Sequence, residues 1–418
     1  MSVAAGRVRA VSMQITDRPS DADVLRAAMV QRLRQRGALR SDLIAQAFRT
    51  VPRHLFAGDV PLEDAYDEES VVRIKYGADG ACISSVSAPN AQAVMLEMAG
   101  IERGDRVVEY GSGGYNAALL AELVGPTGRV TTVDIDPEVT DRASRCLERA
   151  GYSRVRVTLA DAEAGVDGGP FDKAMVTFGA WDIPAAWVEQ LAGGGSLAVP
   201  LRIAGLTRVI AFVRDGGGLV STAHEMFGFV PAQGAGSHPA PTVGLAPGIA
   251  LEFDDGFPDD PRALARALRS PRAEAWSGVT TPGMTPFDLL HLWLAFTLPG
   301  VCKVRVAAQR AAEADCPVRE VMGPAASRSG SFAYLTCRRL DEREPSERGV
   351  WEFGARGFGP HACEVADLVV AEVRTWNASY RHAPAPRIIA RRADLPAEPP
   401  AVGVEIVKRH MRISTVWG

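Results

Sequence analysis

The stretch Val107-Val108-Glu109-Tyr110-Gly111-Ser112-Gly113-Gly114-Tyr115-Asn116 decides the fold, because an apolar strand runs through a glycine-rich turn into a helix. Glycines at such a turn let the backbone approach a ligand closely, and the next helix offers unpaired N–H groups at its N-terminus. A dinucleotide fingerprint needs its third glycine where Asn116 stands, so the nicotinamide-type pattern fails here. The stretch therefore predicts a nucleoside ligand of another kind.

Acidic residues follow the next two strands of the same pattern. Asp134 comes directly after the strand 129–133, where a carboxylate suits a ribose with both hydroxyls free. Asp161-Ala162 follows the strand 155–159 and suits the adenine end of the same ligand. Because the carboxyl ends of parallel strands meet at one edge of a sheet, we expect these residues to lie together. The alternative is structural: Gly111 and Gly113 make a tight turn, and Asp134 caps a helix.

Strands and helices alternate on both sides of this turn. The pattern predicts an α/β fold with a mainly parallel, doubly wound sheet and right-handed crossovers. Helices are expected before the sheet, from Ser20 to Gly37 and from Ser41 to Arg49, and the segment 61–88 is expected to be irregular. Within the sheet region we expect strands at 106–110, 129–133, 155–159, 171–178 and 196–201, helices at 117–124, 137–150 and 184–191, and antiparallel edge strands at 208–214 and 227–230.

The length of 418 residues suits two domains, each able to bury its own core. We expect a flexible tail at 1–19, a first domain at 20–235 and a Gly-, Pro- and Ala-rich linker at 236–260. Residues 261–418 are expected to form a smaller α+β domain. Within it we expect a helix at 286–298, a strand at 301–306, a helix at 365–376 and late strands near 387–390 and 402–407.

Composition excludes several classes of partner. The 46 basic and 50 acidic residues give a net charge of −4, which provides no electrostatic footprint for nucleic acid. No apolar stretch approaches the roughly 20 residues of a membrane span, and the start MSVAAGRVRA is not typical of a secretory signal. The six cysteines form no C-x-x-C pair, so neither a disulfide framework nor a metal site is indicated. We expect a cytoplasmic protein; its oligomeric state is not indicated.

Taken together, the motifs resemble those of the protein-L-isoaspartate O-methyltransferase family. The glycine turn resembles its first cofactor motif, Val86-Ser87-Ala88-Pro89-Asn90 its I-S-Q/A-P segment, and Glu189–Gly195 its E-Q-L-x-x-G-G. The resemblance covers about 20–235 and implies a Rossmann-like class I methyltransferase fold. Further matches, in chain order, are Arg53-His54-Leu55-Phe56, Phe171-Asp172, Val199-Pro200-Leu201 and Phe229-Val230-Pro231.

The resemblance also implies a cofactor, S-adenosylmethionine, which leaves as S-adenosylhomocysteine. Methyl transfer to a carboxylate that is anionic at neutral pH needs no general base. Ser87 is implied to lie beside the substrate carboxylate as the catalytic residue, although it also suits a helix N-cap. The expected substrate residues are Ser87, Val86, Ala88, Pro89, Asn90 and Trp181, and the expected cofactor residues are Glu109, Gly111, Ser112, Gly113, Tyr115, Asn116, Asp134, Ile135, Asp161, Ala162 and Thr177.

The sequence departs from the family in three places. The family's G-D-G is Ala160-Asp161-Ala162 here, the glycine turn is one residue shorter, and the chain runs far beyond Pro231. These departures resemble the branch associated with ribosomally made, modified peptides of the lanthipeptide, lasso and graspetide types. That branch implies methylation of an ordinary Asp of a constrained peptide, followed by aspartimide formation, with residues 261–418 recognising the peptide. The alternatives are general repair of isoaspartyl proteins and a non-catalytic, cofactor-binding recognition module.

Overall fold

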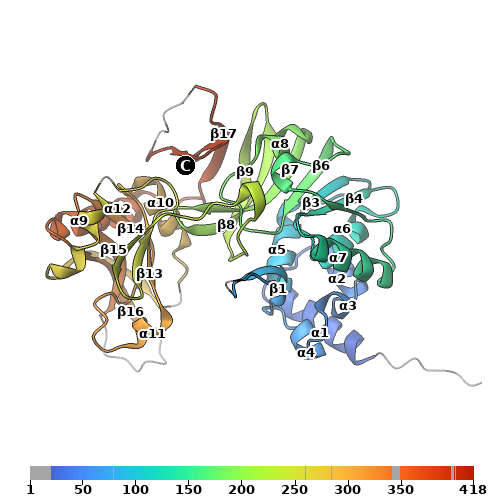
Figure 1. The fold of residues 1–418 in the computed structure, drawn as a ribbon, viewed down its shortest axis with the longest axis horizontal. Coiled ribbons are helices and arrows are strands. Elements are labelled where there is room, and N and C mark those ends of the chain that lie inside the picture. Colours follow the sequence, from blue (N-terminus) through green and yellow to red (C-terminus); the bar gives the residue numbers. More distant parts are fainter. Residues whose placement is uncertain are drawn as a thin grey trace, which may run out of the picture.

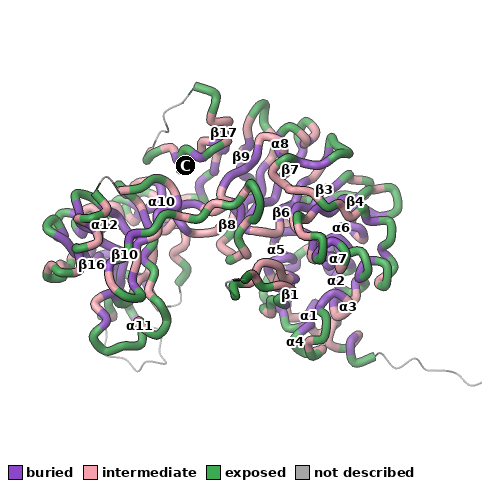
Figure 2. The backbone as a smooth tube through the Cα atoms, viewed as in Figure 1, coloured by how far each residue is buried: buried purple, intermediate pink, exposed green. Residues whose placement is uncertain are grey.

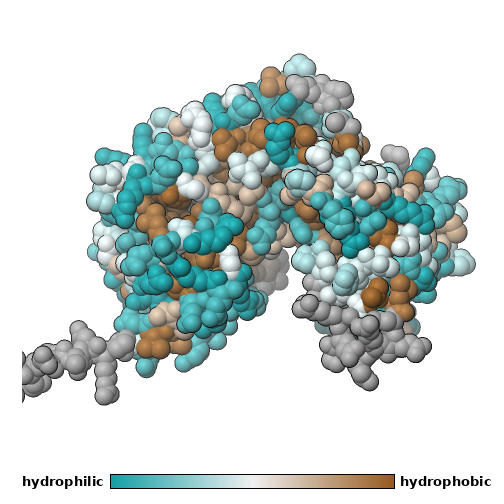
Figure 3. Space-filling model, turned by 180° about the vertical axis from the view of Figure 1, so that it is seen from behind, coloured by the Kyte–Doolittle hydropathy of each residue, from teal (hydrophilic) through white to brown (hydrophobic). Residues whose placement is uncertain are grey.

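The computed structural model describes residues 20–78, 80–258, 260–283, 285–340, 349–396, 400 and 402–418. The expected tail at 1–19 lies outside the described residues. The chain forms two lobes, the first holding the blue and green elements of Figure 1 and the second most of the yellow and orange ones. Seen from the opposite side, a notch separates the two lobes at one end of the molecule (Figure 3).

A ten-stranded sheet forms the centre of the first lobe, with the order β18-β19-β17-β9-β8-β7-β6-β3-β4-β5. The strands from β7 to β5 pair in parallel, whereas β7, β8 and β9 form an antiparallel meander. The expected α/β fold is thereby confirmed. The bounds are β3 Arg106–Tyr110, β4 Arg129–Asp134, β5 Arg156–Leu159, β6 Phe171–Val176, β7 Leu191–Ile203, β8 Leu206–Asp215, β9 Gly218–Met226, β17 Arg387–Arg392, β18 Ile406–Val407 and β19 Met411–Val416.

Helices cover both faces of this sheet, as the alternation predicted. Ser20 caps the first helix through a reciprocal capping box with Asp23, and Ser41 caps the second. These contacts satisfy N–H groups that a helix N-terminus otherwise leaves unpaired. The bounds are α1 Asp21–Gln35, α2 Asp42–Thr50, α3 His54–Ala57, α4 Leu62–Ala65, α5 Pro89–Ala99, α6 Tyr115–Val124, α7 Pro137–Arg149 and α8 Ala185–Glu189.

Two apolar clusters hold the sheet from its two faces. The strands between them are buried along much of their length (Figure 2). On one face, α6 and the N-terminal helices pack around Tyr115, whose ring contacts Phe48 and Phe56. On the other face, the ring of Tyr110 stacks on that of Trp187 at 4.9 Å between centroids. Burial of apolar surface on both faces fixes the strands, so the loops at their carboxyl ends are carried by a rigid frame.

Three local expectations are wrong. The segment 61–88 contains a hairpin of β1 Val72–Tyr76 and β2 Cys82–Val86. Residues 227–230 form no strand, because the antiparallel edge strand is β9. The segment 236–260 contains β10 Thr242–Ala246 and β11 Ile249–Glu252, in which Val243 and Leu251 are buried partners. Short strands with few apolar residues are hidden by a Gly- and Pro-rich composition.

The second lobe packs one long helix, α12 Ala362–Ser379, on an antiparallel sheet of order β12-β16-β15-β14. A smaller sheet of order β10-β11-β13 lies beside it. The expected helix at 286–298 and strand at 301–306 are confirmed as α10 and β13. The bounds are α9 Pro261–Leu264, β12 Ala273–Pro282, α10 Asp288–Thr297, β13 Lys303–Val306, α11 Ala308–Ala312, β14 Ala325–Arg328, β15 Ser331–Arg339 and β16 Val350–Phe358.

The last strands leave this second lobe and return to the first. β17 pairs with β9 and with β19, so the three C-terminal strands extend the ten-stranded sheet. Ile388, Ala390, Met411 and Ile413 are buried in the same cluster as Trp187. The sequence-based expectation placed these strands in the smaller domain; the structure places them in the larger sheet, because their alternating apolar residues complete its core.

Candidate functional site

A cleft opens at the carboxyl ends of β3, β4, β5 and β6. This is the edge at which open α/β sheets bind ligands. The structure therefore brings together residues that the strand pattern placed at one edge. Eight of the expected cofactor residues line the cleft: Gly111, Ser112, Gly113, Asp134, Ile135, Asp161, Ala162 and Thr177.

Gly111 gives the turn its shape. Its φ of +96° lies in the region that favours glycine, and its N–H donates to the carbonyl of Val133 at 2.7 Å. Its carbonyl accepts from Thr177 Oγ1 at 3.0 Å. A Cβ at Gly111 would lie 2.5 Å from that same hydroxyl. Any other residue here would therefore have a strained backbone and would clash with Thr177. The turn is thus bound to the strands on both sides and exposes backbone to the cleft.

Asp134 joins the glycine turn to the end of β4. Its Oδ2 accepts from the N–H of Ser112 at 2.9 Å, and its Oδ1 accepts from the N–H of Asp136 at 3.0 Å. The side chain that caps α7 is Asp136, so the helix-cap alternative for Asp134 does not hold. Burial raises the pKa of Asp134. A carboxylate has about four lone-pair positions, and those still available face a cleft that suits hydroxyl donors.

The segment after β9 closes the adenine side of the expected ligand site. Asp161 Oδ2 accepts from the N–H of Ala235 at 2.9 Å, and Gln233 Nε2 donates to the carbonyl of Ile83 in β2 at 3.0 Å. A Cβ at Gly234 would lie 2.4 Å from Asp161, so this segment packs directly on the acid. The cleft is therefore covered by residues distant in sequence from the glycine turn.

Sequence reasoning did not assign eight residues that line the cleft. Two of them have a usable signal, since Val133 precedes the acid at the strand end and Pro231 belongs to a matched motif. The residues of β2 have none, because their strand was taken as irregular. The unassigned residues are Ile83, Ser84, Ser85, Val133, Phe178, Val230, Pro231 and Gln233.

Three expected cofactor residues are turned away from the cleft. Glu109 is fully buried and accepts hydrogen bonds from Thr132 Oγ1 at 2.6 Å and from Asn116 Nδ2 at 2.8 Å. Tyr115 is fully buried beneath the guanidinium of Arg53, 4.9 Å from its ring centroid. Successive side chains of a strand point to opposite faces, so Glu109 faces α6 while Tyr110 faces α8. These three residues support the turn from behind.

Burial raises the pKa of Glu109 to about 7, from an ordinary value of 4.5. The folded protein therefore keeps this proton at pH values where the unfolded chain has lost it. This contribution to stability is full below about pH 4.5 and is lost as the pH rises towards 7. We expect Glu109→Gln, which titrates in neither state, to gain ~2.5 kcal/mol of unfolding free energy relative to the native protein between pH 5 and pH 8. Urea unfolding of both proteins at pH 5 and pH 8 measures this change. If the two proteins differ in unfolding free energy by the same amount at both pH values, the prediction is contradicted.

The expected substrate residues lie at the start of α5, next to the cleft. Ala88 is the N-cap of this helix and makes no side-chain cap bond, so Ser87 is not the cap. Ser87 is partly exposed, and its side chain has no hydrogen-bond partner among the described residues. Val86 lies against Gly113, whose Cβ would be 3.8 Å from it. None of the five residues from Val86 to Asn90 lines the cleft itself, which is bordered by Ser84 and Ser85 instead.

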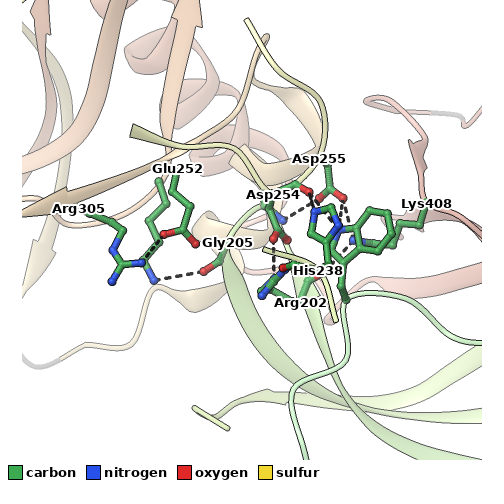
Figure 4. A network of polar contacts seen from close by, with 11 residues as sticks. Arg202, Gly205, His238, Glu252, Asp254, Asp255, Arg305 and Lys408 are labelled. Atoms are coloured by element: carbon green, nitrogen blue, oxygen red, sulfur yellow. Dashed lines mark hydrogen bonds and ion pairs between the residues drawn. The ribbon is translucent and has the colours of Figure 1, made fainter. Parts of the chain in front are cut away.

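Trp181 lines a smaller cavity that shares Asp161, Ala162, Phe178 and Gln233 with the cleft. Its ring stacks on His238 at 3.7 Å, and its Nε1 donates to the carbonyl of Asp254 at 3.0 Å. Behind the ring lies a network of buried charges (Figure 4). It pairs Arg202 with Asp254 at 2.5 Å and Lys408 with Asp255 at 2.8 Å. The wall of this smaller cavity is thus fixed by residues from three distant parts of the chain.

Lys408 is the cation on which this network depends most. Its side chain is fully buried, and its Nζ also donates to the carbonyl of Arg202 at 3.0 Å. Because Lys408→Met leaves two neighbouring carboxylates with one cation, we expect a loss of ~3–5 kcal/mol in unfolding free energy. Adding Asp255→Asn should recover part of it, since one buried charge is removed. Chemical denaturation of both variants tests this, and a double variant no more stable than the single contradicts it.

Among the described residues, no helix has the length and apolarity needed to span a membrane. The same residues contain no group of three or more His, Cys, Asp or Glu side chains placed to bind a metal ion.

Comparison with known proteins gives consistent matches to one family. The family model of protein-L-isoaspartate(D-aspartate) O-methyltransferase matches residues 25–236. A protein-L-isoaspartate O-methyltransferase 2 of Archaeoglobus fulgidus is 38% identical over 183 residues, 43% of this chain and 80% of that protein. One of Thermococcus onnurineus is 40% identical over 184 residues, with the same shares. A solved protein-L-isoaspartate O-methyltransferase is similar over 93% of this chain and 99% of its own, with a TM-score of 0.49 and 21% identity.

Proposed function

Because the chain belongs to the protein-L-isoaspartate O-methyltransferase family, we propose that it methylates the free carboxylate of isoaspartyl residues in peptides or proteins. An isoaspartyl residue joins the next residue through its side chain, so its α-carboxylate is free to accept a methyl group. The chain is an S-adenosylmethionine-dependent carboxyl O-methyltransferase. The observation that supports methyl transfer most directly is the cleft itself, in which the glycine turn and Asp134 lie beside the serines of β2.

The residues of the cleft fit S-adenosylmethionine. Gly111 and Gly113 expose backbone at the turn, and Asp134 presents a carboxylate with acceptor positions left for ribose hydroxyls. Ser112 Oγ is buried without a hydrogen-bond partner among the described residues, which leaves a polar atom for a ligand to satisfy. Asp161 and Ala162 border the side expected for adenine. When bound, the cofactor supplies an electrophilic methyl group.

The protein's own part in the reaction is positioning. The substrate carboxylate is anionic at neutral pH, so no side chain has to remove a proton. Holding the reacting groups in line supplies about 7–11 kcal/mol of the barrier. Segment 230–235 and β2 cover the cleft and exclude water from it. Ser87, which lies next to the cleft, orients one carboxylate oxygen, as the family pattern implies.

This role of Ser87 predicts a separation of binding from turnover. We expect Ser87→Ala to keep native affinity for S-adenosylhomocysteine and to lower kcat about tenfold, since one hydrogen bond to a charged group is lost. Calorimetry and initial rates measure the two quantities. A variant with native kcat would remove Ser87 from the site, and Ser84→Ala and Ser85→Ala would then identify the serine that acts.

The proposed activity is tested by incubating the full chain with an isoaspartyl peptide, its ordinary aspartyl counterpart and methyl-labelled S-adenosylmethionine. The expected result is base-labile label on the isoaspartyl peptide alone. Absence of label on both peptides, from protein that binds the cofactor, refutes the proposal and favours a non-catalytic recognition module.

A second candidate is methylation of an ordinary Asp in a constrained, ribosomally made peptide. The observation that favours it is the second lobe, which lies beyond the residues matched by the family model. Both readings use the same cleft, and the family match favours the isoaspartyl substrate. A cyclised Asp-containing peptide separates them by mass: a gain of about 14 Da, or a later loss of about 18 Da relative to the starting peptide, on that peptide but not on linear isoaspartyl peptides supports this candidate.

A further inference from the structure

A second cavity lies at the junction of the lobes, away from the cofactor cleft. It has a volume of about 630 Å³ and lies between the turn joining β7 to β8, the strand β13 and the segment 318–324. The turn contributes Ala204 and Leu206, so the cavity begins on the same strand that passes behind the cleft. No residue of the cleft lines it, and the methyl-transfer chemistry above makes no use of it.

One side of this cavity is a strand edge without a neighbour. β13 is the outer strand of its sheet and pairs only with β11. At Cys302 the chain still forms two backbone hydrogen bonds with Ala325, of 2.9 and 2.8 Å. From Lys303 to Val306 the described residues offer no further backbone partner on that side, and the segment 318–324 stands off across the cavity. Unpaired N–H and C=O groups of this kind are a template for an added strand.

The cavity is lined mostly by apolar side chains, and two cationic side chains, Lys303 and Arg319, also line it. Lys303 is exposed, and its Nζ donates to the carbonyl of Gly205 at 3.3 Å, its one hydrogen-bond partner among the described residues. Arg319 donates to the carbonyls of Cys316 and Glu313. Neither cation forms an ion pair with a carboxylate of the described residues, whereas Glu320 beside them is paired with Arg356. The cavity therefore carries positive charge that a ligand with carboxylates complements. Its apolar part consists of Val304, Val306, Ala311, Val318, Val321 and Met322.

The cavity lies within reach of a polypeptide held in the cleft. Phe178 lines the cleft, and two residues later Ala180 hydrogen-bonds to Pro200 and Arg202 of β7 at 2.9 and 2.8 Å. β7 ends at Ile203, directly before Ala204 in the cavity wall. Counted along these strands, the path is about 20 Å, which an extended chain covers in roughly six residues.

We propose that this cavity binds an extended, acidic segment of the substrate polypeptide as an added strand beside β13, about six residues from the residue that is methylated. The inference rests on the proposed function, because it takes the occupant to be part of the same substrate. Backbone pairing with β13 gives the segment its extended form, Lys303 and Arg319 select carboxylates, and the valines receive alternate apolar side chains. The second lobe thereby sets which isoaspartyl sites the enzyme prefers.

The test uses the full chain and three synthetic peptides. The first is a short neutral isoaspartyl peptide; the second adds a six-residue Gly/Ser spacer and Glu-Val-Glu-Val-Glu; the third replaces each Glu with Lys. Extensions on either side of the isoaspartyl residue are compared. The expected result is a KM at least about tenfold lower for the acidic peptide than for the short one, in one orientation, with similar kcat and no gain for the Lys peptide. Equal KM values for all three overturn the proposal.

Matched variants assign the gain to the cavity. Ala311→Trp fills it from an exposed position on α11, while Ala312→Trp changes the neighbouring residue, which does not line it. Lys303→Glu reverses the cavity charge, and Arg305→Glu reverses a charge two residues along the same strand, outside the cavity. Only Ala311→Trp and Lys303→Glu should abolish the lowering of KM by the acidic extension, and both should keep native rates on the short peptide. If Ala312→Trp and Arg305→Glu abolish it equally, the proposal is overturned.

A binding measurement separates the two proposals. Fluorescein-labelled Glu-Val-Glu-Val-Glu without an isoaspartyl residue should raise its anisotropy with the native protein and not with Ala311→Trp. If this binding is present while the short isoaspartyl peptide is not methylated, the proposed function fails and the acidic site stands. If the short peptide is methylated and neither binding nor a KM gain is seen, the site fails alone.

Discussion

Ending the chain at Gly236, where the family match ends, should yield protein that neither folds stably nor binds S-adenosylhomocysteine. The cut removes β17, β18 and β19 and leaves β9 as a bare edge. It also removes buried apolar side chains whose transfer is worth on the order of 10 kcal/mol, comparable to the whole stability of about 5–15 kcal/mol of a typical domain. Circular dichroism and calorimetry with the truncated protein measure both losses. The side chains removed are Ile388, Ala390, Ile406, Met411 and Ile413.

Point variants keep this prediction testable if the truncated protein cannot be isolated. Ile413 is fully buried in the sheet core, whereas Val407 in the neighbouring strand is 54% exposed. Ile413→Ala should lower the unfolding free energy of the full chain by ~2–4 kcal/mol, because it leaves a cavity in that core. Val407→Ala should have almost no effect. A truncated protein that folds and binds the cofactor would mean that residues 25–236 are sufficient.

Replacing Asp134 with Ala should weaken the binding of S-adenosylhomocysteine at least about 100-fold. Two hydrogen bonds between ribose hydroxyls and a charged group contribute ~3 kcal/mol or more together, and every 1.4 kcal/mol is a factor of ten in Kd. The N–H of Ser112 also loses its acceptor, which loosens the glycine turn. Isothermal titration calorimetry measures the change in Kd.

Asp136 provides the matched control. It is the next acid along the chain, caps α7 and pairs with Lys75 at 2.7 Å, but does not line the cleft. Asp136→Ala should cost ~1 kcal/mol of stability through the lost cap and leave Kd unchanged. Its backbone N–H, which Asp134 accepts, is kept. Native affinity of Asp134→Ala, or an equal loss in Asp136→Ala, would contradict the assignment of the ribose to Asp134.

The parts of the site that could be predicted from sequence are those defined by local pattern. Gly111, Asp134 and Asp161 each follow a strand of the parallel sheet, and that topology alone places them at one edge. The face of the sheet to which a side chain of such a strand points is harder to predict from the sequence. Glu109 stands beside the turn in sequence, yet the pleat directs it into the core, where Thr132 and Asn116 satisfy it.

Contacts between distant segments could not be predicted. Ser84 and Ser85 belong to a hairpin with register shifts, so no regular alternation marks it as a strand. Gln233 reaches the cleft by packing against β2, and Lys408 pairs with Asp255 from a distant part of the chain. Local periodicity encodes neither contact. For the same reason the late strands were expected in the second lobe, although β17 pairs with β9 of the first.

The return of the chain to its first sheet has a consequence for biogenesis. Val220 of β9 pairs with Ile389 of β17, and the second lobe is synthesised between these two strands. A ribosome therefore releases the whole second lobe before this edge is covered, and such long-range pairing forms slowly. Until then the nascent enzyme exposes an unpaired strand edge, so its maturation, unlike its chemistry, depends on strands synthesised long after β9.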